Sequence, residues 1–135
     1  MSDKLASPPR VEIGFVSRDT GLRDFLATVF RLDPLPPVEL PTGSLYCMAG
    51  YETVFKVFVP NEAPEPQKRS GAFFGIEGLR FLTIRVDDVD DVVERAAASG
   101  GRVLQGPHEP VPGIRVAMLE DPDGNTLEAS QRLLA

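Results

Sequence analysis

The chain is poor in the side chains that cross-link proteins or bind metals. Its 135 residues include one cysteine, Cys47, and one histidine, His108. A single cysteine excludes a disulfide within the chain and agrees with a reducing cytoplasm, where we expect the protein to reside. Because Cys47 lies in an apolar stretch with no evident base, we expect a small buried side chain and not a nucleophile.

Basic residues and long apolar runs are also scarce. The chain has 14 Lys and Arg against 20 Asp and Glu, which gives a net charge of -6. This balance argues against a nucleic-acid surface, which needs clustered cations. No apolar run reaches the roughly 18 residues of a membrane span. Residues 1–10 are polar and have no signal-peptide core, and we expect a flexible N-terminus there. We therefore expect no nucleic-acid or membrane partner.

What remains is typical of a soluble globular protein. Hydrophobic residues make up 42% of the chain and charged residues 25%. A chain of this length predicts one domain, or two small halves that share one core.

The first half shows a strand pattern followed by a helix pattern. Apolar side chains alternate over residues 11–16, with Glu12 on the opposite face from its neighbours. Residues 17–20 supply helix N-cap types. The apolar residues after them recur at the spacing of one helix face. They are Leu22, Phe25, Leu26 and Val29. Three strands are predicted next, at residues 38–40, 44–49 and 53–59.

The second half repeats this plan. Residues 81–86 predict a strand, and Asp87 and Asp88 cap a helix that Gly100 and Gly101 end. The acidic run at residues 87–91 suits a helix N-terminus better than a metal site. Strands are predicted at residues 102–105, 114–120 and 125–130. Each half is therefore β-α-β-β-β, and such a repeat predicts two halves around a shared core.

A tight turn joins the last two strands. In Asp121-Pro122-Asp123-Gly124, proline presets φ, the aspartates can bond backbone amides, and glycine takes a positive φ. The turn predicts an antiparallel hairpin whose second strand carries Glu128.

A connector at residues 61–79 separates the halves. It is rich in proline and glycine and long for a compact domain, so it predicts a lid or an arm reaching a partner chain. Phe73 and Phe74 would anchor it on an apolar surface.

The repeat and the final Asp-Pro-Asp-Gly-x-x-x-Glu motif resemble the vicinal oxygen chelate superfamily, which includes glyoxalase I, bleomycin-resistance proteins and extradiol dioxygenases. The resemblance covers residues 11–131. It implies an α+β fold of two βαβββ modules, residues 11–60 and 80–135, whose curved mixed sheets surround a cavity. The modules pair within one chain or across a dimer, and we expect a homodimer.

The resemblance also places the superfamily's four metal-ligand positions. They correspond here to Glu12, Lys56, Phe81 and Glu128. A protonated lysine and a benzyl group cannot bind a cation, and His108 lies in a predicted loop away from these strands. We therefore expect no metal and no other cofactor.

Glu12, Lys56 and Glu128 have three interpretations. They could form a structural ion-pair network in an unused site. They could be catalytic, with Lys56 polarising a substrate carbonyl while Glu12 or Glu128 moves a proton. Alternatively, Lys56 faces solvent.

Further residues are candidates for binding a small molecule in the cavity. The arginines among them could clamp a carboxylate or phosphate, or could be surface residues paired with acids. The candidates are Phe58, Phe74, Phe81, Thr83, Arg85 and Arg115.

Three functions follow from the resemblance. The first is a metal-independent lyase or isomerase that acts on a small oxygenated substrate. The second is a protein that sequesters a small molecule of the antibiotic type without turnover. The third, a metal-dependent glyoxalase or dioxygenase, is disfavoured by Lys56 and Phe81. Fold alone does not choose among them.

Overall fold

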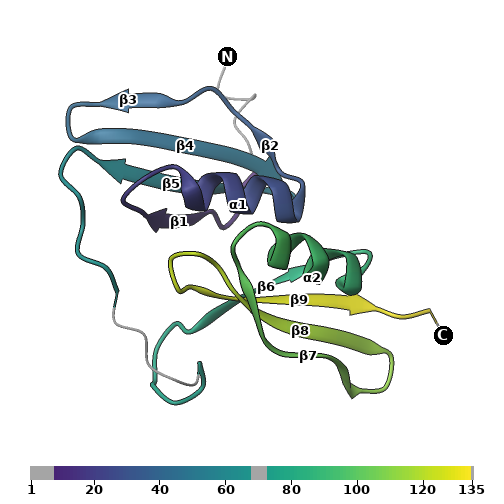
Figure 1. Cartoon of the computed structure of the whole chain (residues 1–135). Helices are drawn as coiled ribbons and strands as arrows, with labels where there is room; N and C mark the ends of the chain where they lie inside the picture. Colours follow the sequence, from purple (N-terminus) through teal and green to yellow (C-terminus); the bar gives the residue numbers. More distant parts are fainter. Residues whose placement is uncertain (1–7, 68–72, 135) are drawn as a thin grey trace.

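A computed structural model describes residues 8–67 and 73–134, whose strands form two separate sheets (Figure 1). The first sheet has the order β1 (Ile13–Val16), β5 (Thr53–Pro60), β4 (Gly43–Gly50) and β2 (Asp33–Pro34), and β3 (Val38–Leu40) also pairs with β4. The second has the order β6 (Phe81–Arg85), β9 (Thr126–Arg132), β8 (Ile114–Glu120) and β7 (Arg102–Val111). The predicted α+β class with two glyoxalase-like sheets is confirmed.

Each sheet contains one parallel pair that a helix makes possible. β1 runs parallel to β5, and β6 runs parallel to β9. Parallel strands need a long crossover connection, and each crossover begins with a helix. These helices are α1 (Gly21–Phe30) and α2 (Val89–Ala98). Asp88 caps α2 by accepting a hydrogen bond from the Asp91 backbone N–H, as the acidic run predicts.

One hydrophobic core serves both halves. The predicted stripe of α1 is at most 2% exposed, and it shares a cluster with residues of α2 and of both sheets. The helices also meet directly, because the Arg95 guanidinium donates hydrogen bonds of 3.0 and 2.8 Å to the Val29 carbonyl oxygen. Burial of each large apolar side chain is worth about 1.5–3 kcal/mol, so this shared core is the main source of stability.

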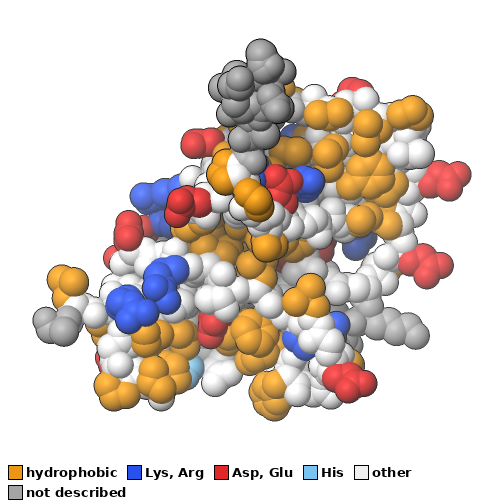
Figure 2. Space-filling model, turned by 180° about the vertical axis from the view of Figure 1, so that it is seen from behind, with side chains coloured by type: hydrophobic (Ala, Val, Ile, Leu, Met, Phe, Trp, Pro, Cys, Tyr) orange, Lys and Arg blue, Asp and Glu red, His pale blue; other side chains and the backbone are white. Residues whose placement is uncertain are grey.

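α1 covers one face of the first sheet and leaves the other uncovered (Figure 1). Along β5, Phe55 and Val57 are buried in the core, while Lys56 and Phe58 lie on the opposite face. We call this opposite side the uncovered face. Seen from behind, the molecule shows hydrophobic side chains gathered over the first sheet (Figure 2). Cys47 is the cross-strand partner of Lys56 and is half-buried there, so the prediction of a small buried side chain is wrong.

The predicted hairpin turn is confirmed. The Gly124 N–H donates to the Asp121 carbonyl oxygen at 3.0 Å, and Gly124 has a φ of 90°. The Asp121 carboxylate accepts two backbone hydrogen bonds of 2.9 Å, from the N–H groups of Asp123 and Asn125. The turn is therefore fixed by its own side chain as well as by its backbone.

β7 is longer than predicted and corrects the position of His108. The strand continues to Val111, and His108 pairs with Val116 of β8. The pairing register shifts on both sides of His108, which accommodates Gly106 and Pro107. Proline lacks an N–H and marks an irregularity in a ladder, and for this reason the sequence pattern predicted a loop. No helix in the described part of the chain is long and apolar enough to cross a membrane.

Candidate functional site

The main cavity lies beside β1, at the end of the second sheet where β6 and β9 begin. Its volume is about 650 Å³. Residues 11–15, 79–82 and 124–127 form most of its wall, and Gln67 and Phe73 of the connector complete one side. The cavity therefore brings together both halves of the chain and the segment that joins them.

Aromatic rings form part of this wall. Phe81 is 45% exposed, and its ring centroid lies 6.0 Å from that of Phe73 in an edge-to-face arrangement. Phe74 contacts Phe73 but is 76% exposed and lies outside the lining. The connector is thus anchored by Phe73, and the prediction that Phe74 shares this role is wrong.

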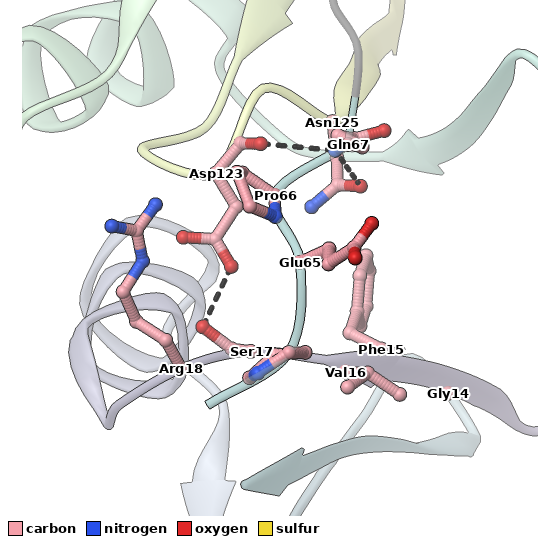
Figure 3. Close-up of a pocket in the computed structure, with 11 residues that line it drawn as sticks. Gly14, Phe15, Val16, Ser17, Arg18, Glu65, Pro66, Gln67, Asp123 and Asn125 are labelled. Carbon is pink, nitrogen blue, oxygen red and sulfur yellow. Dashed lines mark hydrogen bonds between the residues drawn. The ribbon is translucent and has the colours of Figure 1, made fainter. Parts of the chain in front are cut away.

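A smaller side compartment of about 300 Å³ adjoins the main cavity. The two share Gly14, Phe15, Gln67 and Asn125. Gln67 lines both, and its side-chain amide donates to the Asp123 carbonyl oxygen (2.9 Å) and to Asn125 Oδ1 (3.0 Å) (Figure 3). The compartments are therefore parts of one cleft along β1.

A partly buried hydrogen bond lies at one end of the side compartment. Ser17, at the end of β1, is 2% exposed, and its hydroxyl donates to Asp123 Oδ2 at 2.6 Å (Figure 3). The sequence suggested only local roles for the two residues, a helix cap and a turn. Their separation of 106 positions gives no periodic signal that could have predicted the contact.

Glu12 and Lys56 form the ion pair that strand parity predicts. Lys56 Nζ lies 2.9 Å from Glu12 Oε1, and Arg10 Nη2 lies 3.0 Å from Glu12 Oε2. The hydrogen bond from Lys56, and secondly that from Arg10, holds the pKa of Glu12 below its ordinary value. The same bond to Glu12 raises the pKa of Lys56. Both side chains are partly exposed, so solvent weakens the pair.

Glu128 is separate from this pair. It lies on β9 of the second sheet, where the Thr83 hydroxyl donates to Glu128 Oε1 at 2.7 Å. In residues 8–67 and 73–134, no ion pair joins Lys56 to Glu128, and neither lines the main cavity. Of the three predicted catalytic residues, the structure brings together only Glu12 and Lys56.

The remaining predicted ligand-binding residues lie mostly outside the cavity. Arg115 Nη2 is 2.8 Å from Asp90 of α2, and this contact keeps the pKa of Asp90 below its ordinary value. Arg115 is thus a surface arginine paired with an acid, the second of the two interpretations that the sequence allowed, and it does not line the main cavity. Phe58 is half-buried on the uncovered face, and Arg85 is exposed. Only Phe81 of the six candidates lines the main cavity.

Comparison with known proteins identifies the family. The sequence profile of the Glyoxalase/Bleomycin resistance protein/Dioxygenase superfamily matches residues 48–129. The chain belongs to this superfamily. Among curated protein sequences, none matches the chain.

Solved structures of this superfamily share the fold. A glyoxalase/bleomycin resistance protein from Streptomyces sp. CB03234 is 26% identical with a TM-score of 0.63, and the match covers 89% of this chain and 97% of that chain. TnmS3, an antibiotic binding protein from the same organism, is 24% identical with a TM-score of 0.62 over 94% and 99% of the two chains. The fosfomycin resistance protein FosX from Listeria monocytogenes is 15% identical with a TM-score of 0.70, over 96% and 95%.

The superfamily's metal-ligand positions do not fit a divalent ion in this chain. Glu12 and Glu128 supply carboxylates, but Lys56 and Phe81 supply no donor. The Glu12 carboxylate is already bound by two cations, and Glu128 accepts a hydrogen bond from Thr83. Among the described residues, no group of three or more His, Cys, Asp or Glu could hold a metal. A first-row ion needs three or four convergent donors, so this donor set is too small.

Proposed function

We propose that the chain binds a small, largely apolar molecule in the main cavity and does not transform it. The observation that carries this proposal is the cavity itself. Its volume of about 650 Å³ falls in the range of ligand pockets, roughly 300–1,000 Å³. Phe73, Phe81, Leu82 and Leu104 give it the apolar wall that such pockets share.

The state of Glu12 favours binding over catalysis. It lines the cavity, but two cations stabilise its carboxylate and lower its pKa. A general base works best with a pKa near the working pH, and a depressed pKa makes Glu12 a weaker base. Within the described part of the chain, the hydrogen-bond partner of Glu128 is Thr83, and Glu128 does not line the cavity with Glu12.

A structural neighbour supports the binding role, and exposed apolar side chains support a homodimer. TnmS3, which shares the fold, is an antibiotic binding protein. We propose that two chains form a homodimer in the cytoplasm and that no metal is needed. The uncovered face supports a dimer, because Val16, Val38 and Leu40 are 60%, 46% and 43% exposed and a partner would bury them.

A neutral fluorescent probe, N-phenyl-1-naphthylamine, tests the binding proposal. We expect saturable binding with one probe per cavity, and about tenfold weaker binding by Phe81→Ala, because a large apolar contact is lost. Leu134→Ala is the matched control, since Leu134 is 99% exposed outside the cavity. Binding that does not saturate, or that is equal in Phe81→Ala, contradicts the proposal.

A second candidate is a metal-independent lyase or isomerase, and the 2.9 Å Lys56–Glu12 pair favours it. Lys56 would stabilise negative charge on a substrate oxygen while Glu12 or Glu128 takes a proton. NMR of α-proton exchange in hydroxyacetone dissolved in D₂O separates the candidates. If the native chain speeds this proton exchange more than the Lys56→Met variant does, catalysis is supported. Equal exchange rates with the two proteins would support simple binding.

A further inference from the structure

The charged side chains of the main cavity are unevenly satisfied. Among the residues that the structure describes, four charged side chains line it: Glu12, Arg80, Arg102 and Glu120. Glu12 is paired with Lys56 and Arg10. Arg102 Nε lies 2.8 Å from Glu120 Oε1, and this carboxylate is only 10% exposed. Three of the four charges are therefore neutralised by neighbours.

Arg80 is the exception. Its Nε donates a hydrogen bond of 3.1 Å to the carbonyl oxygen of Leu79, a neutral acceptor. Throughout residues 8–67 and 73–134, no carboxylate lies within ion-pair distance of its guanidinium. A guanidinium carries five N–H donors, so Arg80 keeps several for another partner.

Arg80 lies next to the aromatic part of the cavity wall. It directly precedes Phe81 at the start of β6, and Phe81 packs edge-to-face with Phe73. All three residues line the same cavity. Apolar walls with a few placed polar groups bind ligands in a fixed orientation, because the walls take the body and the polar group takes one end. An arginine matches planar oxyanions best, since it can form two parallel hydrogen bonds.

We propose that the molecule bound in the main cavity carries an anionic oxygen group beside an aromatic or other apolar body. The body lies against Phe73 and Phe81, and the anion pairs with Arg80. This inference rests on the proposed binding function and adds the chemical class of the ligand. A cation is disfavoured because both acids of the lining are already paired.

Two probes with one aromatic skeleton test the proposal. They are 8-anilinonaphthalene-1-sulfonate, which is anionic, and the neutral N-phenyl-1-naphthylamine, which lacks only the sulfonate. We expect tighter binding of the anionic probe to the native chain. We expect the Arg80→Gln variant to bind the anionic probe about fivefold more weakly, because a charge-assisted hydrogen bond at a solvent-exposed site is lost. The affinity of this variant for the neutral probe should be unchanged. Added salt should weaken only the anionic probe.

Arg132→Gln is the matched control, because Arg132 is an exposed arginine at the far end of β9 from the cavity. It should bind both probes as the native chain does. If the neutral probe binds and Arg80→Gln leaves the anionic probe unchanged, the anion inference is overturned while the binding function stands. If Arg132→Gln weakens the anionic probe equally, attraction is a general charge effect, and the inference is also overturned. If neither probe binds, the proposed function itself fails.

Discussion

Ser17 and Asp123 are 106 positions apart in the chain, and their side chains share a hydrogen bond of 2.6 Å. The bond joins the end of β1 to the hairpin turn of the second half, beside the side compartment. Ser17 is nearly fully buried, so water cannot easily replace the lost partner if the bond is removed.

We expect Ser17→Ala to lower the free energy of unfolding by about 1 kcal/mol, with unfolding followed in urea. Ser44→Ala is the control, because the Ser44 hydroxyl makes an exposed bond of 2.6 Å to nearby Glu39. Its effect should be smaller. An equal effect of the two substitutions would mean that the contact between the halves adds nothing beyond a surface hydrogen bond.

Lys56→Met should raise the pKa of Glu12 toward its ordinary value. Lys56 is the main cause of the depressed pKa, so Arg10→Gln should raise it less. A carboxylate with a depressed pKa stabilises the fold above its unfolded pKa, near 4.5, and this contribution is lost as the pH falls through the folded value. NMR titration of the Glu12 side chain measures the change. An unaltered titration in Lys56→Met would show that the ion pair does not form in solution.

Asp121 should titrate at a higher pH than an ordinary aspartate. Burial raises its pKa to about 6, although hydrogen bonds from Asn125 and Asp123 oppose the shift. A raised carboxyl pKa gives stability that is complete below the unfolded value, 3.8, and is lost as the pH rises through about 6. Unfolding measured from pH 4 to pH 7 should therefore show a fall in stability.

Asp121→Asn is the comparison, because its side-chain carbonyl can still accept the two backbone hydrogen bonds of the turn. The fall in stability over this pH range should be smaller in this variant. An identical pH profile would assign the dependence to another group.

Gly14→Leu should block ligand binding without harming the fold. Gly14 lines both the main cavity and the side compartment, and a Cβ added there would meet no atom within 4 Å. The longer leucine side chain would extend from this open position into the cleft. We expect an unchanged melting temperature and about tenfold weaker binding of the neutral probe, with a smaller effect of Gly14→Ala. Undiminished binding by Gly14→Leu would place the ligand elsewhere.

Local patterns were sufficient to predict most of the fold. The stripe of α1 has a helical period, and the Asp121 turn follows from residue types with defined backbone preferences. The end of β7 was not predictable in this way. Gly106 and Pro107 are typical of a loop, and only pairing with β8 keeps them in a strand.

The site was predicted less well because it depends on packing across the halves. Strand parity was enough to place Lys56 on the same face as Glu12, since Glu12 directly precedes β1 and Lys56 lies on the neighbouring strand β5. Phe73 lies in the connector and Arg80 directly follows it, and no periodic pattern there says which side chain turns inward. Their role depends on how β1 lies against the end of the second sheet, which no local signal specifies.

The hydrogen bonds from Arg95 to the Val29 carbonyl oxygen join the two halves, so we expect the halves to unfold together. Cleavage of the connector would leave two fragments, and each would expose an apolar helix face that the other fragment buries in the intact chain. Neither piece should persist alone as a compact body. The intact chain should instead melt in a single concerted transition, despite the duplicated plan of its sequence.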